Sequence, residues 1–382
     1  MSKEIYMDYA ATTYIKPEVI EEMKLYIDEY FGNASSVYHI SRKTKMAIDA
    51  SRQRIASAIN SNVDEIYFTS GGSESDNWAL KGIASAHKVK GKHIITTSIE
   101  HHAVINTCKY LEKLGFDVTY LPVNKYGKIE LKDLRKAVRN DTIIVSVMFA
   151  NNEIGTIQPI KQIGDFCRQR KIIFHTDAVQ AVGNIQIDVK DMNIDLLSMS
   201  SHKFYGPKGV GALYIRKGIR IDNLIHGGSQ ERGRRAGTYN TPGIVGIGKA
   251  LDIAVQNLEV QKDRLTKLRD MFIQKLLKIQ GTSINGALGE DRLPGNINVS
   301  FKGVDAETLL MMLDARGICV SAGSACSAGA LEPSHVLIAI GLTPKLARSS
   351  IRFTIGSGTA EEEINYVVEV VKECIEKLKD NK

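Results

Sequence analysis

Residues 142–183 read TIIVSVMFANNEIGTIQPIKQIGDFCRQRKIIFHTDAVQAVG, and this stretch decides the fold. TIIVSVMFA (142–150) is a β-rich run, residues 159–170 keep helical spacing, and KIIFHTDA (171–178) is a second β-rich run. Two nearly continuous apolar strands joined by a helix are typical of a parallel sheet that helices cover on both faces. The stretch therefore predicts an α/β protein.

The same alternation extends to both sides of this unit. Further strands are expected at EIYFTS (65–70), HIITTS (93–98), DVTYLPV (117–123), DLLSMSS (195–201) and GALYIR (211–216). Helices are expected at 17–31, 42–60, 73–90, 101–115 and 130–139. A loop rich in Gly and Arg, HGGSQERGRRAGTYNTPG (226–243), then interrupts the pattern, and loops of this length are usually functional or disordered.

The C-terminal third has a different organisation. A long helix is expected from about 244 to 279. After it come the strand NINVSF, a helix at 305–316, the small-residue loop SAGSACSAGALEP, a helix near 334–341, the strand SIRFTIG and a last helix at 360–379. This mixture predicts a second, smaller α+β domain.

Composition limits the classes of protein that the chain can belong to. The 382 residues are 43% hydrophobic, which allows a sizeable core and excludes a disordered chain. The net charge of +7 is spread along the chain, so we expect no nucleic-acid-binding patch. No apolar run is long enough to span a membrane, and the start MSKEIYMDYAATT has no secretory h-region, so a cytoplasmic protein is expected. Five cysteines without a C-x-x-C spacing predict neither a metal site nor a disulfide framework.

Polar clusters follow several predicted strands, at the sheet edge where open α/β sheets bind ligands. TSGGSES (69–75) offers free backbone N–H groups, a hydroxyl and a helix start, which suit a phosphate. Taken alone, this stretch is more often an ordinary capped turn than a phosphate site. SSHKFYGPKG (200–209) places Lys203 at a buried strand exit, where a neutral amine can form a Schiff base. A surface lysine in a Gly/Pro turn is the alternative.

Two further clusters complete the pattern. HTDAVQAVG (175–183) provides Asp177, which either fixes a proton on a heterocyclic nitrogen or caps the next helix. SIEHHA (98–103) and ANNEIG (150–155) provide His101, suited to ring stacking or proton transfer, and Asn152, suited to a ring hydroxyl. Jointly the clusters describe a site for a phosphate, a pyridine nitrogen and an aldehyde. Pyridoxal 5′-phosphate (PLP) is the cofactor that carries these three groups.

The sequence resembles the cysteine desulfurases of the NifS/IscS type, which are class V aminotransferase-like, fold-type I PLP enzymes. The resemblance runs nearly from end to end, and GSAC together with R-x-A-G-T narrows it to the desulfurases. Its marks are MDYAATT (7–13), FGN (31–33), TSGGSESDN (69–77), EHHAV (100–104), NNEIGTIQPI (151–160), HTDAVQAVG (175–183), SHKFYGPKGVGALY (201–214), HGGSQERGRRAGT (226–238), GSACSAGALEPSHVL (323–337) and SSIRFTIG (349–356).

This resemblance implies the fold and the domain boundaries. We expect a fold-type I PLP-dependent transferase whose large domain (15–258) holds a mostly parallel seven-stranded sheet. The smaller α+β domain is expected to combine residues 1–14 and 259–382, and to carry a mobile cysteine loop at about 321–333. In FGNASS, Ala34 stands where the family often has Pro, which puts the turn that positions Asn33 in doubt.

The resemblance also implies roles for the residues of the cofactor site. Lys203 resembles the Schiff-base lysine, Asp177 matches the partner of the pyridine nitrogen, and His101 matches the ring-stacking acid/base. The groups that match binders of the phosphate and of the ring oxygen are Gly72, Ser73, Asn152, Gln180, Ser200 and His202. Ser73 replaces a frequent Thr and keeps the hydroxyl.

Four more residues match parts of the family's reaction. Arg352 and Asn33 match the clamp on the substrate carboxylate, a role that suits the two parallel hydrogen bonds of a guanidinium. Thr238 matches a residue that reaches the phosphate of the neighbouring subunit, so a homodimer is implied. Cys326 matches the nucleophile that becomes a persulfide, and its small-residue surroundings suit a mobile thiol.

The implied activity is removal of sulfur from L-cysteine, giving L-alanine and a Cys326 persulfide. The implied acceptor is an iron–sulfur scaffold protein or a tRNA-thiolation enzyme, and Cys326 is a candidate transient ligand of a cluster built on such a scaffold. A selenocysteine lyase or another class V PLP enzyme remains an alternative. A non-catalytic scaffold with this fold is disfavoured, because Lys203, Asp177, His101, Cys326 and Arg352 are all present.

Overall fold

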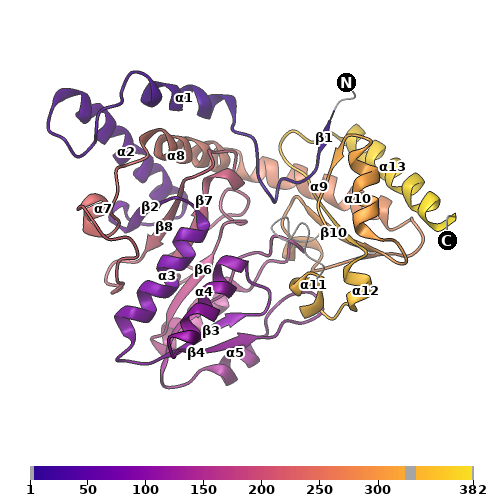
Figure 1. Ribbon diagram of the computed structural model, residues 1–382, viewed down its shortest axis with the longest axis horizontal. Coiled ribbons are helices and arrows are strands. Elements are labelled where there is room, and N and C mark those ends of the chain that lie inside the picture. Colours follow the sequence, from indigo (N-terminus) through magenta and orange to yellow (C-terminus); the bar gives the residue numbers. More distant parts are fainter. Residues whose placement is uncertain (1–3, 323–332, 381–382) are drawn as a thin grey trace.

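The computed structural model describes residues 4–322 and 333–380, and its centre is a seven-stranded sheet (Figure 1). The strands lie in the order β2 (Ile66–Thr69), β8 (Gly211–Ile215), β7 (Leu196–Ser200), β6 (Ile173–Asp177), β5 (Thr142–Ser146), β3 (His93–Thr97) and β4 (Asp117–Leu121). From β7 to β4 all neighbours are parallel, and β8 alone runs against both of its neighbours. The expected mostly parallel α/β sheet is confirmed.

Successive residues of each central strand enter different hydrophobic cores. Ile94, Ile144 and Leu196 pack against one face, whereas their neighbours Ile95, Val145 and Leu197 pack against the other. Because side chains alternate along a strand, a strand covered on both faces reads as a continuous apolar run.

The helices divide between the two faces of the sheet. One face is covered by α3 (Gly72–His87) and α4 (His102–Lys113). The other is covered by α1 (Pro17–Ile27), α2 (His39–Ala58), α5 (Leu131–Ala137), α6 (Ile160–Arg170) and α8 (Thr241–Gln256). Short 3₁₀ turns are η1 (Val63–Glu65), η2 (Ser201–Lys203) and η3 (Gly289–Asp291).

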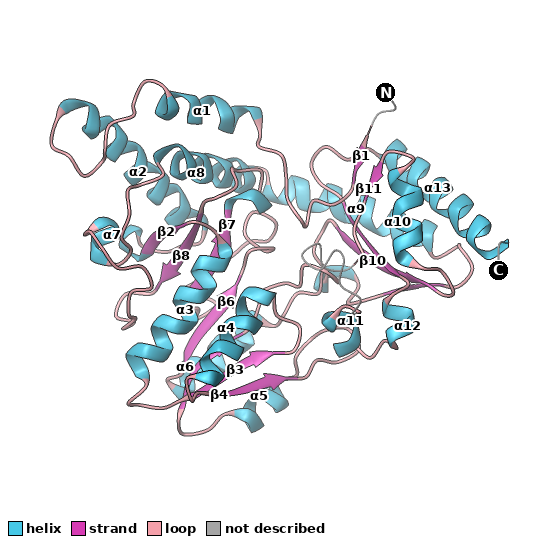
Figure 2. Ribbon diagram, viewed as in Figure 1, coloured by secondary structure: helices cyan, strands magenta, loops and turns pink. Residues whose placement is uncertain are grey.

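A second unit with its own core stands beside this sheet (Figure 2). Its antiparallel sheet has the order β12 (Ser350–Thr354), β10 (Asn296–Phe301) and β9 (Thr282–Ile284), and β1 (Ile5–Tyr6) pairs with β11 (Ile318–Cys319). Its helices are α9 (Leu258–Leu276), α10 (Ala306–Asp314), α11 (His335–Ala339), α12 (Pro344–Ala347) and α13 (Glu361–Asp380). Met7 packs into this core together with C-terminal residues. We propose that the two units are the two expected domains.

The long helix expected from 244 to 279 is two helices. Asn257 ends α8 and begins α9, with φ −106° and ψ 8°. Its side-chain amide donates to the carbonyl oxygen of Ile253 at 2.8 Å. A side chain that hydrogen-bonds a backbone carbonyl four residues back competes with the helix, which explains the break.

The Gly- and Arg-rich loop contains one short turn of helix, α7 (Gln230–Gly233), where Glu231 and Arg232 have positive φ values of 47° and 57°. The buried Glu231 holds this turn against the sheet through a bidentate pair with Arg52, at 2.8 and 2.9 Å. None of the helices in the described part of the chain combines the length and apolarity that a bilayer-spanning segment needs.

Candidate active site

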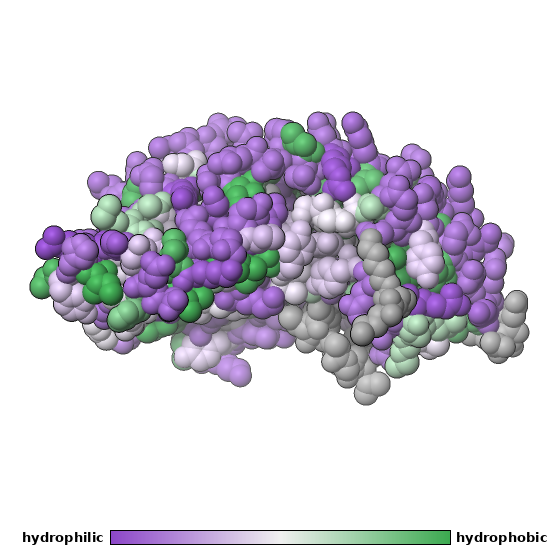
Figure 3. Space-filling model, turned by 90° about the horizontal axis from the view of Figure 1, so that it is seen from above, coloured by the Kyte–Doolittle hydropathy of each residue, from purple (hydrophilic) through white to green (hydrophobic). Residues whose placement is uncertain are grey.

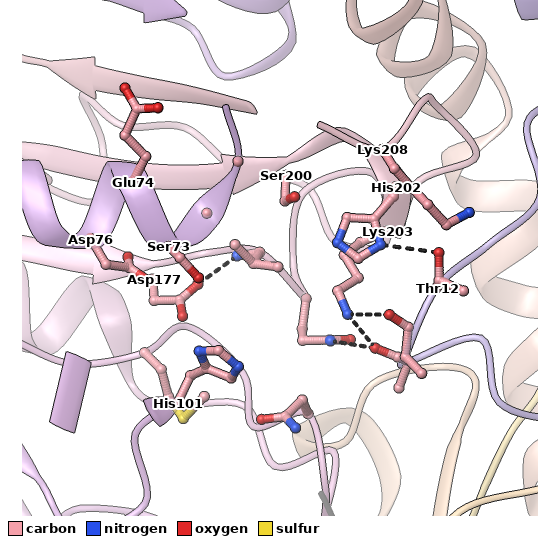
Figure 4. Close-up of a pocket in the computed structure, with 18 of the residues that line it drawn as sticks. Thr12, Ser73, Glu74, Asp76, His101, Asp177, Ser200, His202, Lys203 and Lys208 are labelled. Carbon is pink, nitrogen blue, oxygen red and sulfur yellow. Dashed lines mark hydrogen bonds between the residues drawn. The ribbon is translucent and has the colours of Figure 1, made fainter. Parts of the chain in front are cut away.

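A cavity of about 510 Å³ opens at the carboxyl ends of the parallel strands (Figure 4). Its walls come from the segments after β2, β3, β5, β6 and β7, together with residues 10–12 and Arg352 of β12. The carboxyl ends of parallel strands meet at one edge of a sheet, so side chains that are distant in the sequence converge there. The predicted residues in this wall are Gly72, Ser73, His101, Asn152, Asp177, Gln180, Ser200, His202, Lys203 and Arg352.

Gly71 and Gly72 form the floor of the cavity at the start of α3. A Cβ on Gly72 would lie 2.6 Å from Cγ2 of Val179, so a larger residue there would force Val179 to shift. No side chain in the described residues caps α3 at Gly71, which leaves helix N–H groups facing the cavity. This helix start, with the hydroxyls of Ser73 and Ser200 beside it, suits an anion such as phosphate.

His202 adds a neutral imidazole to the same wall. Burial, followed by the charges of Lys203 and Lys208, lowers the pKa of His202 to about 4. Its Nδ1 lies 3.1 Å from Oγ1 of Thr12. At neutral pH the ring is therefore uncharged and can offer an N–H to an anion without carrying a charge itself.

Asp177 ends β6 with its side chain at the cavity, 5% exposed. Its Oδ1 accepts the N–H of Val179 at 2.9 Å, which holds a local turn. Residues 179–182 form turns and not a helix, so Asp177 does not cap one. Burial raises the pKa of Asp177, and the charges of His101 and Lys203 oppose that rise.

Lys203 ends the η2 turn that follows β7, and its amine points into the cavity. Nζ donates to the carbonyl oxygens of Ala10 and Ala11 at 2.6 and 2.7 Å. Thr13 holds the same turn from the other side, because its N–H donates to the carbonyl oxygen of His202 at 2.9 Å. The N-terminal segment thus positions the lysine, a contact that the sequence analysis did not identify.

His101 stands at the start of α4 and faces the cavity. Its Nδ1 accepts the N–H of Ala103 at 3.1 Å, so in the neutral ring the proton is on Nε2. Burial lowers the pKa of His101, and the charge of Asp177 partly offsets this. Gln180 lines the same wall and donates to the carbonyl oxygen of Ala10 at 3.0 Å.

Arg352 closes the cavity from the second unit, 1% exposed. Its Nη2 lies 2.7 Å from Oδ1 of Asp8, and Nη1 donates to the backbone carbonyl oxygen of Asn152 at 3.2 Å. Nε is buried without a partner among the described residues. The guanidinium therefore bridges the two units while facing the cavity.

Two predicted residues of the described part of the chain lie outside the cavity wall. Asn33 is exposed in the connection between α1 and α2, where its Oδ1 accepts the N–H of Ser35 at 2.9 Å. The structure therefore does not form the expected clamp of Asn33 with Arg352 within one chain. Thr238 is also exposed, outside the cavity wall of its own chain. Cys326 lies outside the described residues.

The four other cysteines offer no comparable nucleophile. Cys108, Cys167 and Cys374 are buried, and Cys319 is partly buried. Burial raises the pKa of each of these thiols above its usual value. A raised pKa disfavours the thiolate that a nucleophile needs.

Comparison with known proteins places this geometry in a family. Residues 5–367 match the Aminotransferase class-V family. Cysteine desulfurase IscS of Clostridium botulinum strain Hall is 56% identical over all of this chain and 96% of its own length. Cysteine desulfurase IscS of Methanosarcina thermophila is 55% identical over 99% of this chain and 94% of its own length.

Solved structures agree with the sequence relatives. A NifS-like protein superposes with a TM-score of 0.93 at 39% identity, covering 98% of this chain and all of the other. A structure of SspA in complex with cysteine superposes with a TM-score of 0.82 at 40% identity, covering 92% of this chain and 99% of the other. The chain belongs to the class-V aminotransferase family and, within it, to the cysteine desulfurases of the IscS and NifS type.

Proposed function

We propose that this chain removes sulfur from L-cysteine, releasing L-alanine and leaving a persulfide on Cys326. The observation that carries the proposal is the convergence of Lys203, Asp177 and Arg352 on one cavity, from segments distant in the sequence. Relatives named cysteine desulfurase and a neighbouring structure that holds cysteine support the same substrate. Cysteine desulfurases of this family depend on PLP.

The residues present fit PLP. The glycine floor and the uncapped start of α3 suit the phosphate, since a side chain at Gly72 would meet Val179. The buried carboxyl group of Asp177 suits a pyridine nitrogen, and Lys203 suits the aldehyde. When bound, PLP supplies an aldehyde that reacts with amines and a ring that withdraws electrons from the substrate Cα.

We assign each proton and each charge to a residue of this chain. Arg352 binds the substrate carboxylate and so fixes Cα toward Lys203, which takes and returns the Cα proton. Asp177 holds the proton on the pyridine nitrogen. His101 exchanges a proton through Nε2, because Nδ1 already accepts a backbone N–H.

Cys326 then acts as a thiolate on the substrate sulfur. A new S–S bond forms, and the Cβ–S bond of the substrate breaks with its electron pair remaining on the carbon. A proton added at Cβ completes the methyl group of alanine, and the sulfur stays on Cys326 as a persulfide. The atoms balance without any external oxidant or reductant.

We further propose that the protein is a homodimer in the cytoplasm and passes the sulfur to an acceptor protein of iron–sulfur assembly or tRNA thiolation. Exposed apolar side chains gather near the connection between α1 and α2, which lies toward one end of an otherwise mostly hydrophilic face (Figure 3). They include Ile27, Phe31 and Val37, exposed by 64%, 74% and 89%. Asn33 in this connection and Thr238 are then available to a partner subunit.

The decisive experiment measures labelled persulfide after incubation with ³⁵S-cysteine. Cys326→Ala is expected to abolish the protein-bound label, whereas the matched variant Cys319→Ala keeps it. Full sulfide release from cysteine by Cys326→Ala would contradict the nucleophile assignment. Alanine formed by Cys326→Ala from selenocysteine but not from cysteine would favour a selenocysteine lyase, because selenium can leave without a nucleophile. Lys203→Ala is expected to lose the visible absorption that wild-type protein gains with PLP, and an unchanged spectrum would contradict the lysine assignment.

A further inference from the structure

Three carboxyl groups lie buried close together at the wall of the cavity and behind it. Asp76 on α3 is 1% exposed, Asp177 at the end of β6 is 5% exposed, and Glu100 before α4 is 1% exposed. Asp76 and Asp177 both line the cavity wall and lie beside each other (Figure 4). Three neighbouring negative charges in a medium of low polarity would repel each other strongly, so some of these groups must hold protons.

The partners of the three groups differ in kind. Asp177 has a backbone N–H from Val179 and the charge of Lys203 nearby, both of which favour its ionised form. Among the described residues, the hydrogen-bonding neighbour of Asp76 is the hydroxyl of Ser198. Its Oδ1 has no hydrogen-bond partner among the described residues.

The nearest group that could offset a charge on Asp76 is an imidazole, and it is neutral. Nε2 of His175 lies 3.6 Å from Oδ1 of Asp76, and the ring is 0% exposed. The ring is held between two hydroxyls, with Nδ1 2.8 Å from Ser146 and Nε2 3.0 Å from Ser198. Burial lowers the pKa of His175 to about 3, so this contact is not an ion pair at neutral pH.

We propose that Asp76 is a positioning residue that stays a neutral carboxylic acid, so that Asp177 is left as the ionised carboxylate that would hold a proton on the pyridine nitrogen. The inference rests on the proposed function and extends it to a residue in the helical turn after the glycine floor. Ser198 and His175 hold Asp76 in place from the neighbouring strands β7 and β6. A second charged carboxylate there would compete with Asp177 for the proton on the pyridine nitrogen.

The electrostatics of the pocket agree with this geometry. Burial raises the pKa of Asp76 well above its usual value, and the neighbouring charges of Asp177 and Glu100 raise it further. The Ser198 hydroxyl opposes this rise only in part. The titratable groups that face Asp76 are thus Asp177 and His175 on β6 and Glu100 before α4.

The first test reads the proton directly on protein without cofactor. Infrared spectra separate the C=O stretch of a carboxylic acid from that of a carboxylate. At about pH 6 an acid band is expected that Asp76→Asn removes and Glu100→Gln keeps, and the separate contribution of Glu100 should disappear as the pH rises through about 8. If Asp76→Asn removes no acid band, the inference is overturned. The infrared measurement does not depend on catalysis. A negative result would therefore overturn the inference about Asp76 without contradicting the proposed desulfurase activity.

The second test separates positioning from a merely structural role. Asp76→Asn keeps an uncharged hydrogen-bonding side chain, so the visible absorption of the protein loaded with PLP should titrate with an unchanged midpoint. Asp76→Leu loses the bond to Ser198 and should release PLP about tenfold faster, the effect of one lost hydrogen bond of about 1.4 kcal/mol. Equal release rates for the two variants, or a shifted midpoint for Asp76→Asn, would overturn the role. If the leucine variant does not fold, the infrared comparison still decides.

Discussion

Oδ1 of Asp8 lies 2.7 Å from Nη2 of Arg352, although 344 positions separate the two residues in the sequence. The pair joins the N-terminal segment to β12 of the second unit, at the wall of the cavity. Two residues further along the same segment, the carbonyl oxygens of Ala10 and Ala11 hold the amine of Lys203. One short segment therefore positions both the proposed carboxylate clamp and the proposed Schiff-base lysine.

Removing the carboxylate of Asp8 should destabilise the folded protein. Arg352 is 1% exposed, so Asp8→Ala leaves a buried charge without its partner and is expected to lower the free energy of unfolding by about 3 kcal/mol. Denaturant titration of the protein without cofactor measures the loss. The control is the double variant Asp8→Ala with Arg352→Leu, which removes both charges and should lose less than the sum of the single changes. Strictly additive losses would show that the pair contributes nothing.

The buried carboxyl group of Glu100 should make the folded protein less stable as the pH rises. A carboxylate that is ion-paired in the folded state has the opposite effect. Its Oε1 accepts bonds from Thr97 and from the N–H of Met148, while Oε2 has no partner among the described residues. Burial raises the pKa of Glu100 from 4.5 to about 8. Between these values the folded chain keeps a proton that the unfolded chain has released, so the contribution to stability is full below about pH 4.5 and is lost as the pH rises to about 8.

Glu100→Gln carries no titrating group and should flatten this part of the profile. The difference in unfolding free energy between wild type and variant should change by at most about 1.4 kcal/mol for each pH unit. Denaturant titrations at several pH values within this window measure it. An identical slope in both proteins would mean that Glu100 is already ionised in the folded state.

Much of the architecture could be predicted from the sequence, because the deciding signals are local. The seven strands of the central sheet were each expected as a β-rich run, and each run corresponds to a strand from β2 to β8. Polar segments that line the cavity follow five of them. The short strands β1, β9 and β11 were not predicted, since two or three residues carry no periodicity. The reversed direction of β8 likewise depends on tertiary pairing that no local pattern encodes.

The residues of the site divide in the same way into those that local sequence patterns predict and those whose role depends on tertiary contacts. Lys203, Asp177 and His101 were expected at strand exits and line one cavity. Asp8 was missed, although MDYAATT was identified as a motif, because its partner Arg352 lies at the other end of the chain. Asp76 was missed because its significance comes from burial beside Asp177, and a sequence shows neither burial nor the absence of a counter-charge.

The close contact between Gly72 and Val179 at the floor of the cavity can be tested with a second substitution that relieves it. Gly72→Ala would place a Cβ 2.6 Å from Cγ2 of Val179, so the wall must shift and PLP should bind about tenfold more weakly, a loss of about 1.4 kcal/mol. Val179→Ala in the same protein removes that methyl group and should restore most of the affinity. Equilibrium binding followed by PLP absorbance measures both. If the double variant binds no better than Gly72→Ala, the clash with Val179 is not the cause.

The ion pair between Arg52 and Glu231 should be a main support of the Gly- and Arg-rich loop. The two side chains are buried, and Oε2 of Glu231 also accepts the N–H of Phe68 at 3.0 Å. Glu231→Ala would leave a buried guanidinium and a buried N–H unpaired, so the free energy of unfolding should fall by about 3–5 kcal/mol.

Arg52 and Glu231 also hold the loop in a conformation that the backbone alone disfavours, with Glu231 at a φ of 47°. The exposed pair of Lys24 and Glu21 is the matched control, and Glu21→Ala should change stability by no more than about 0.5 kcal/mol. Because the same loop carries Thr238, Glu231→Ala should weaken PLP binding as well if Thr238 of one subunit completes the site of the other. Weaker folding with unchanged PLP affinity in the folded fraction would show that the loop serves stability alone.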